Sequence, residues 1–181
     1  MCSVSVDCET KPMRAGIALG SNLGDRLAHL QAAKRHLLAL HNGAGPFLCS
    51  KIYETAPVDC PDGSPHFLNA AIELSTQTPP LDFLDALQNI EIALGRPPEH
   101  LFHGPRPIDL DLLHYGDLRM SHASLTLPHP AISDRLFVLR PLMDICPERI
   151  VGTRNQTVRE LCEGCDVPQG FRSSIKFISF F

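Results

Sequence analysis

Two aspartates follow an arginine closely in the segment Gly104-Pro105-Arg106-Pro107-Ile108-Asp109-Leu110-Asp111. Apolar residues alternate with Asp109 and Asp111, and this period of two is typical of a strand with one buried face. Residues two apart in a strand project from the same face, so we expect the two carboxylates to point the same way. Carboxylate oxygens suit Mg²⁺, and the guanidinium of Arg106 suits a phosphate oxygen. The pattern predicts a metal–phosphate site; the alternative is an edge strand carrying two solvated aspartates.

The elements that must position this segment follow from hydrophobic periodicity and turn residues. Strands are predicted over residues 14–19, 47–53, 67–74 and 108–113, and helices over 23–40 and 79–95. Ser21 or Asn22 is expected to cap the first helix. The order β-α-β-β-α-β predicts an α+β fold of the ferredoxin-like (split βαβ) type, in which helices pack on one face of an antiparallel sheet.

A C-terminal extension follows this β-α-β-β-α-β unit. Residues 125–130 are expected to be extended, because a residue that precedes proline avoids the helical region. We predict a helix over 136–146 that carries Pro141, a short helix over 157–162 and a final strand over 175–181. Residues 1–13 are expected to form a loose N-terminal extension, and residues 14–181 a single domain whose motifs lie between about 15 and 147.

Composition excludes several classes of partner. The chain has 181 residues, of which 44% are hydrophobic and 20% charged, and these values are ordinary for a globular protein. A net charge of −4 without any basic run gives no support for nucleic-acid binding. We find neither an apolar run long enough to span a membrane nor a signal peptide, so we expect no membrane partner and a cytoplasmic location. A monomer is expected, with a dimer as the alternative.

Cysteine and histidine are numerous but give no clear motif. The seven cysteines are scattered, and we expect most of them to be free thiols in a reducing compartment. Cys162 and Cys165 have the spacing of half a zinc site, but no second pair follows them, so buried structural thiols are the preferred interpretation. Six histidines are expected at surface or half-buried positions: His36, His41, His66, His100, His114 and His122.

Six further motifs accompany the aspartate segment. They are Gly20-Ser21-Asn22-Leu23-Gly24-Asp25, Tyr53-Glu54-Thr55-Ala56-Pro57, Phe67-Leu68-Asn69-Ala70-Ala71, Glu91 with Gly95-Arg96, Leu127-Pro128-His129-Pro130 and Arg135-Leu136-Phe137-Val138-Leu139-Arg140-Pro141-Leu142. Each motif alone is weak. Together, and in this order, they closely resemble the 6-hydroxymethyl-7,8-dihydropterin pyrophosphokinase family of folate biosynthesis.

The resemblance implies an ATP-dependent diphosphotransferase, which moves pyrophosphate from MgATP to the hydroxymethyl group of the pterin and releases AMP. It implies that Asp109 and Asp111 hold two Mg²⁺ ions, and that Arg106 joins them as a catalytic residue. The implied ATP-binding residues are Gln88, Glu91, Arg96, Arg106, Leu112 (through its backbone), His129 and Arg135. The implied pterin-binding residues are Thr55, Ala56, Val58, Phe67, Asn69, His103 and Phe137, with the two phenylalanines as a stacking pair.

The chain departs from the family pattern in the loop that precedes Gly104. Pro98 stands where an arginine is common, Phe102-His103 replaces an Arg-Trp pair, and Ser124 replaces a basic residue of some members. These changes predict weaker binding of triphosphate. Two rival functions stay open on the sequence alone: a metal-dependent hydrolase or nucleotide-sugar transferase that uses the same aspartates, and a non-catalytic pterin- or nucleotide-binding relative.

Overall fold

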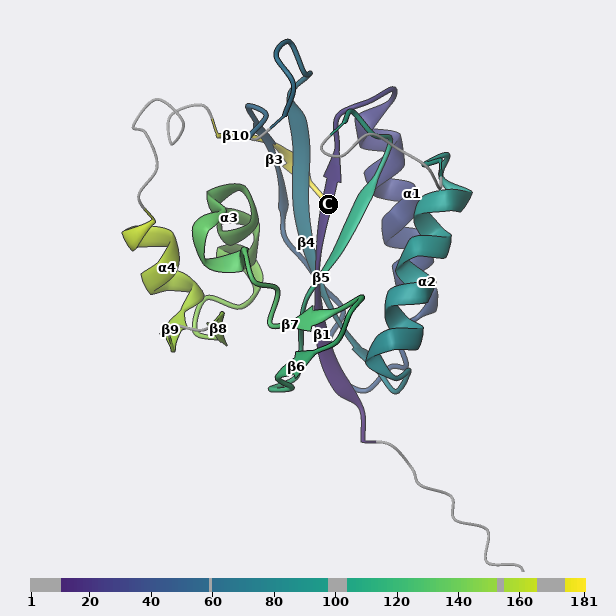
Figure 1. The fold of residues 1–181 in the computed structure, drawn as a ribbon, viewed down its shortest axis with the longest axis vertical. Coiled ribbons are helices and arrows are strands. Elements are labelled where there is room, and N and C mark those ends of the chain that lie inside the picture. The colour runs from purple at the N-terminus through teal and green to yellow at the C-terminus, as the bar shows by residue number, and fades with distance from the viewer. Residues whose placement is uncertain (1–10, 59, 98–103, 153–154, 166–174) are drawn as a thin grey trace, which may run out of the picture.

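The computed structural model describes residues 11–58, 60–97, 104–152, 155–165 and 175–181. Their centre is an antiparallel sheet with strand order β10-β3-β4-β1-β5, in which a short β2 also pairs with β4 (Figure 1). The strands are β1 (Met13–Ser21), β2 (Leu48–Cys49), β3 (Lys51–Thr55), β4 (Phe67–Thr76), β5 (Asp109–Tyr115) and β10 (Lys176–Phe180). β1 and β4 form the middle of the sheet, and all ten residues of β4 are buried.

Helices cover both faces of this sheet, as Figure 1 shows. α1 (Arg26–Ala39) and α2 (Pro80–Ala93) lie on one face, and α3 (Leu136–Ile145) and α4 (Val158–Gly164) lie on the other. A short 3₁₀ turn, η1 (Ile132–Asp134), precedes α3. Two small ribbons complete the described part: β6 (Met120–Ser121) pairs with β7 (Thr126–Leu127), and β8 (Ile150–Val151) pairs with β9 (Gln156–Thr157). No helix among the described residues is long and apolar enough to cross a membrane.

Two hydrophobic clusters follow from this arrangement. The larger one lies between the sheet and α1 and α2, and includes the fully buried Leu30, Leu37, Phe83 and Leu87 of these helices. The second lies between the other sheet face and α3 and α4. It contains Cys162 and Cys165, which are both buried and form no disulfide among the described residues, so their expected burial is confirmed. Alternate residues of the central strands therefore face different cores, and this alternation decides which side chains can form a site.

The predicted fold class is confirmed, and most predicted elements differ from the observed ones by a few residues. The expectation that helices pack on one face is wrong for the complete chain, because α3 and α4 cover the second face. The strand predicted over 47–53 is interrupted at Ser50, whose hydroxyl donates to the Lys51 carbonyl and accepts from the Ala71 amide. The short helix and the final strand of the extension are present as α4 and β10.

Two predictions about single residues are wrong. The N-cap of α1 is Asp25, whose carboxylate accepts a hydrogen bond from the amide of Ala28, and not Ser21 or Asn22. His114 is 2% exposed and lies inside the protein rather than at a surface or half-buried position. The other described histidines of that group, His36, His41, His66 and His122, are exposed or half-buried as expected, whereas His100 lies outside the described residues.

Candidate functional site

The strand register brings the polar residues of three strands to one place on the sheet. Gly20 of β1 lies between Asn69 of β4 and Asp109 of β5, and Ala18 lies beside Asp111 in the same way. A Cβ atom added to Gly20 would lie 3.4 Å from Oδ1 of Asn69 and 3.8 Å from Cβ of Asp109. Small residues on β1 therefore leave open space between the side chains of its two neighbours.

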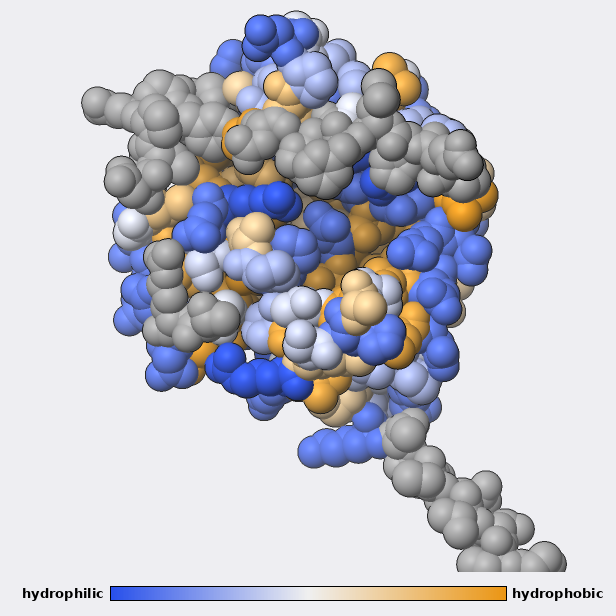
Figure 2. Space-filling view, in the orientation of Figure 1, coloured by the Kyte–Doolittle hydropathy of each residue, from blue (hydrophilic) through white to orange (hydrophobic). Residues whose placement is uncertain are grey.

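This space is part of a cavity of about 310 Å³ between the sheet and the N-terminal end of α3. Its walls contain eleven of the residues that the sequence predicts: Thr55, Ala56, Val58, Phe67, Asn69, Arg106, Asp109, Asp111, His129, Arg135 and Phe137. Ala18, Leu19, Gly20, Cys60, Ala70 and Val138 complete the lining. The face drawn in Figure 2 is hollowed near its centre, where hydrophilic and hydrophobic side chains meet. A cavity with apolar walls and a few polar groups is the usual form of a small-molecule site.

Two arginines hold the carboxylate of Asp109. Its Oδ1 accepts from Nη1 of Arg96 at 2.6 Å, and its Oδ2 accepts from Nη2 of Arg106 at 2.5 Å. The same nitrogen of Arg96 donates to Oε1 of Glu91 at 2.5 Å, and this oxygen also accepts from the amide of Leu110 at 2.6 Å. Glu91 thus joins α2 to the open edge of β5, and burial, with the nearby charge of Asp109, raises its pKa to about 7 despite these bonds.

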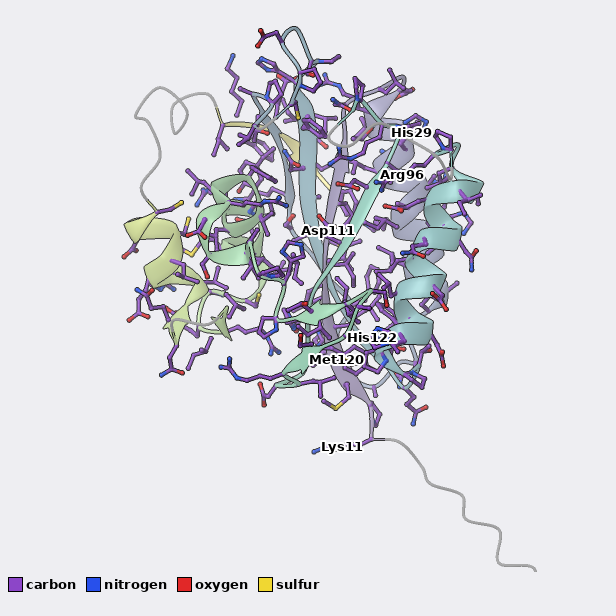
Figure 3. The ribbon with its side chains drawn as sticks, in the orientation of Figure 1. Lys11, His29, Arg96, Asp111, Met120 and His122 are labelled. Atoms are coloured by element: carbon purple, nitrogen blue, oxygen red, sulfur yellow. The ribbon has the colours of Figure 1, made fainter. Side chains whose placement is uncertain are left out.

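Asp111 has a different environment. It lies on β5 near the middle of the molecule, with Arg96 above it toward the end of α2 (Figure 3). No hydrogen bond or ion pair from the described residues reaches its carboxylate. Burial and the neighbouring charge of Asp109 raise the pKa of Asp111, which the more distant arginines oppose. A carboxylate that needs a cation lies beside a second carboxylate, and this pair of oxygen ligands fits Mg²⁺.

Asn22 fixes the turn that carries Arg106. Oδ1 of Asn22 accepts from the amide of Arg106 at 2.8 Å, and the amide of Asn22 donates to the Arg106 carbonyl at 3.2 Å. Its Nδ2 also donates to the carbonyl of Pro65 at 3.5 Å, so one buried side chain joins the end of β1 to two loops. The sequence interpretation missed this role, because Asn near the start of a helix is adequately explained as a cap.

Aromatic and amide groups form the other end of the cavity. Nδ2 of Asn69 donates to Oγ1 of Thr55 at 2.8 Å, and this bond leaves Oδ1 of the amide toward Gly20. The guanidinium of Arg106 lies 5.4 Å from the centre of the Phe67 ring, and that of Arg135 lies 5.8 Å from the Phe137 ring. Each phenylalanine therefore lies beside a cation, at the border between the apolar and the charged parts of the cavity.

His129 enters the cavity from the loop before η1. Its amide donates to the carbonyl of Leu113 at 2.8 Å, and its Nδ1 accepts from the amide of Ala131 at 3.2 Å. Burial and the charge of Arg135 lower the pKa of His129. With Nδ1 used as an acceptor, the neutral ring carries its proton on Nε2, which can donate to an anionic ligand.

The remaining predicted residues lie outside the cavity lining. Glu91 and Arg96 are joined to it through Asp109. Gln88 is exposed on α2, and the side chain of Leu112 belongs to the core. The amide of Leu110 points away from β1, so the backbone of Leu112, two residues on, faces the same open edge. His103, Pro98 and Phe102 lie outside the described residues, whereas Ser124 is exposed and its hydroxyl lies 2.9 Å from Nδ1 of His122.

Comparison with known proteins identifies a family whose sequence pattern covers most of the chain. Residues 16–147 match the family described as 7,8-dihydro-6-hydroxymethylpterin-pyrophosphokinase (HPPK). The chain is 41% identical over 157 residues to a 2-amino-4-hydroxy-6-hydroxymethyldihydropteridine pyrophosphokinase of Methylorubrum extorquens, and the match covers 87% of this chain and 96% of that protein. A Bacillus subtilis protein of the same name is 43% identical over 134 residues, with 74% of this chain and 78% of that one covered.

Some relatives are much longer. A mitochondrial folate synthesis bifunctional protein of Pisum sativum is 41% identical over 141 residues; the match covers 78% of this chain but only 27% of that protein. The chain thus spans about a quarter of the length of the bifunctional plant relatives it matches. A crystal structure of a Plasmodium falciparum HPPK-DHPS triple mutant with pteroate has a similar fold, with a TM-score of 0.68 and 16% identity over 95% of this chain and 48% of that one.

Proposed function

The chain belongs to the 7,8-dihydro-6-hydroxymethylpterin-pyrophosphokinase family, and we propose that it transfers pyrophosphate from MgATP to 6-hydroxymethyl-7,8-dihydropterin in folate biosynthesis. AMP is the second product. One observation carries the proposal: a single cavity contains an amide and aromatic walls at one end and two carboxylates with arginines at the other. This arrangement suits a flat heterocycle whose reacting group meets a metal-bound polyphosphate.

The pterin occupies the end of the cavity formed by Thr55, Ala56, Val58, Phe67, Asn69 and Phe137 in this proposal. Oδ1 of Asn69 accepts from the ring edge, because Thr55 already holds the NH₂ group of the amide. Phe67 and Phe137 provide aromatic surface for stacking. His103, which lies outside the described residues, is a further contact that we infer from the family pattern.

The phosphates and two Mg²⁺ ions bind at the other end. Asp109 and Asp111 hold the ions, which supply charge neutralisation and lower the pKa of the attacking hydroxyl when bound. If Asp109 turns one oxygen to a metal, Arg96 or Arg106 is released to bind a phosphate oxygen. His129 and Arg135 contribute a neutral N–H donor and a second cation from the opposite wall. Such positioning and charge stabilisation are what phosphoryl-type transfer requires.

The nucleoside is placed along the open edge of β5. The backbone of Leu112 faces this edge, and Gln88 and Glu91 lie one turn apart on the helix beside it. In this proposal the Leu112 backbone binds adenine. Glu91 has a structural role as well, because its carboxylate holds both Arg96 and the amide of Leu110.

The first test is AMP formation from MgATP with and without 6-hydroxymethyl-7,8-dihydropterin, followed by chromatography of the nucleotides. We expect AMP only in the presence of pterin, in amounts equal to the pterin pyrophosphate formed. Release of phosphate or nucleoside diphosphate without pterin would instead favour a metal-dependent hydrolase. Pterin binding without any AMP would favour a non-catalytic binding protein.

The partners are then two small molecules, ATP and the pterin, and we propose no nucleic-acid or membrane partner. We propose a cytoplasmic enzyme, as the sequence predicts, although the Pisum sativum relative is named as mitochondrial. The monomeric state stays a prediction.

A further inference from the structure

A second polar cluster lies toward the opposite end of the same sheet face. Gly16 of β1 pairs with Glu73 of β4 on one side and with His114 of β5 on the other. The register shifts between Gly16 and Ile17, which leaves Leu113 as an extra residue on β5 and turns His114 toward the α3 face. A Cβ atom on Gly16 would lie 2.1 Å from Nε2 of His114, so the imidazole occupies the space that this glycine leaves.

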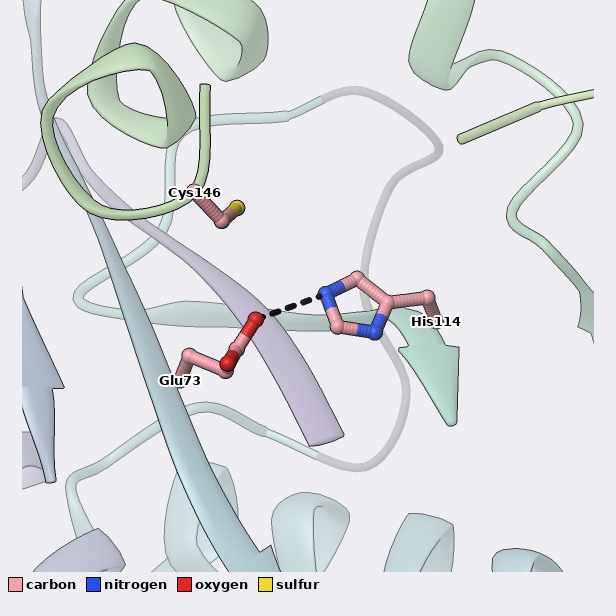
Figure 4. Close-up of side chains that lie close together, drawn as sticks. All are labelled: Glu73, His114 and Cys146. Carbon is pink, nitrogen blue, oxygen red and sulfur yellow. Dashed lines mark ion pairs between the residues drawn. The ribbon is translucent and has the colours of Figure 1, made fainter. Parts of the chain in front are cut away.

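His114 is buried, but its ring is poorly satisfied. It is 2% exposed, and neither ring nitrogen has a hydrogen-bond partner among the described residues. Its Nε2 lies 3.5 Å from Oε2 of Glu73. Sγ of Cys146, at the C-terminal end of α3, completes a group whose three ligand atoms lie within 4.8 Å of one another. Figure 4 shows the thiol, the carboxylate and the imidazole facing a common space.

We propose that Glu73, His114 and Cys146 form a second metal site, separate from the two aspartates, that binds a thiophilic divalent cation with Zn²⁺ as the preferred ion. Imidazole, thiolate and carboxylate form a common ligand set for zinc and a poor one for Mg²⁺. A solvent molecule takes the fourth position. Ligand chemistry thus gives the two sites different preferences: the aspartate pair suits Mg²⁺, and the second site suits Zn²⁺.

The distances suit tetrahedral coordination. Zinc bonds of about 2.0–2.2 Å place nitrogen and oxygen ligands about 3.3–3.6 Å apart. The observed separation between Nε2 of His114 and Oε2 of Glu73 is 3.5 Å. The thiol needs a shift of about 1 Å, given a zinc–sulfur bond of about 2.3 Å. Cys146 is half-buried at the end of its helix, and can make this shift more easily than a residue inside the sheet.

Two arginines compensate Glu73 before a metal binds. Nε of Arg14 lies 2.8 Å from Oε1, and Nε of Arg149 lies 3.2 Å from Oε2. Oε1 can keep Arg14 while Oε2 turns to the metal, and Arg149, whose side chain is 22% exposed, can move into solvent. Burial favours the neutral thiol of Cys146, so metal binding breaks its S–H bond, releases the proton to water and forms a metal–sulfur bond.

Cobalt provides a direct test. The purified chain is treated with a chelator and a thiol reductant, then titrated with Co²⁺ in excess Mg²⁺, which occupies the oxygen site but does not compete for a thiolate. We expect one equivalent of Co²⁺ to give a thiolate-to-cobalt charge-transfer band in the near ultraviolet. Zn²⁺ should remove this band and raise the midpoint of thermal unfolding.

Variants assign the band to this cluster. Cys146→Ser should lose it, and His114→Gln should weaken Co²⁺ binding by about tenfold or more. Cys49→Ser, a change at another half-buried cysteine on β2, should keep both band and affinity. Absence of the band in the unmodified chain, its persistence in Cys146→Ser or its loss in Cys49→Ser would each overturn the proposal. The first of these results needs no variant and is unaffected by any folding defect.

Discussion

At the residue scale, Asp109 and Asp111 differ in what surrounds them. Asp109 is held by Arg96 and Arg106, so its removal would take one carboxylate partner from each of two partly buried arginines. Asp111 has no such contact among the described residues, and its carboxylate lies beside a like charge. Asp111 is therefore the better position at which to separate metal binding from folding.

We expect Asp111→Asn to lower turnover by several orders of magnitude, because one metal ligand is lost. The free energy of unfolding should stay equal or rise, since the substitution removes a buried charge next to Asp109. Steady-state AMP formation and urea unfolding measure the two effects. Asp117→Asn, at an exposed aspartate shortly after β5, is the matched control and should change neither. Substantial turnover in Asp111→Asn would contradict the metal assignment.

Substitution of Asn22 tests a residue that positions Arg106 and does not itself contact a ligand in our proposal. Asn22→Ala should lower the free energy of unfolding by about 1–3 kcal/mol, because the part-buried amide of Arg106 loses its acceptor. It should also reduce kcat/KM, since the turn that aims Arg106 loosens. Asn42→Ala removes a similar side-chain acceptor for the Ala44 amide, but in an exposed turn, and should cost under about 1 kcal/mol without affecting kcat/KM. Equal effects in the two variants would argue against a special role for Asn22.

The sequence predicts residues whose chemistry is local and misses those whose role depends on distant contacts. Alternation around Asp109 and Asp111 is visible in the chain, and the structure places both carboxylates in one cavity. The partner of Asn22 is 84 residues away, so no local pattern shows it. His114 faces the α3 side of the sheet because the register shifts by one residue, and a bulge has no composition signal here.

At the scale of elements, two hydrogen bonds to Asp144 attach α3 to the sheet. The hydroxyl of Tyr53 on β3 donates to Oδ2 of Asp144 on α3 at 2.9 Å, and the amide of Lys51 donates to the same oxygen at 3.0 Å. Periodicity predicts that residues 136–146 are helical, but an apolar stripe does not say which sheet face it will cover. This contact, and the packing around it, decide that question.

We expect Tyr53 to stay protonated well above pH 10. Burial and Asp144 raise its pKa from 10 to about 12, so the unfolded chain loses this proton first, and the stability that it contributes below pH 10 is lost as pH rises toward 12. The chain has two tyrosines and no tryptophan, which makes ultraviolet titration simple to assign. Asp144→Asn should lower the Tyr53 pKa without affecting Tyr115, and Glu148→Gln serves as control. A native midpoint near 10 for Tyr53 would contradict this account.

At the scale of the whole molecule, the cavity is built on the central strands of the sheet, which pack against both hydrophobic clusters. β1, β4 and β5 carry its floor, while α3 closes it from the second face. The ferredoxin-like β-α-β-β-α-β unit alone therefore supplies the aspartates but lacks the cavity wall that contains Arg135 and Phe137. The periodicity of the sequence is enough to assign this unit. The wall cannot be predicted without knowing how the C-terminal extension returns to the sheet.

The last strand protects an edge of that sheet. β10 pairs with β3 from Lys176 to Phe180, and Phe181 packs against the larger core with the ammonium of Lys34 5.1 Å from its ring. Without this strand, β3 would present open backbone groups to other molecules. The expected monomer depends on this protection.

We expect deletion of residues 175–181 to lower the free energy of unfolding by about 2–4 kcal/mol, because several strand hydrogen bonds are lost. The shortened chain should also self-associate, as the edge of β3 becomes free to pair with a second copy. Chromatography with light scattering reports mass, and urea unfolding reports stability. Ile178→Ser, at a side chain that is 43% exposed, keeps the strand pairing and should remain monomeric and stable. A monomeric deletion variant of unchanged stability would show that β10 contributes nothing to either property.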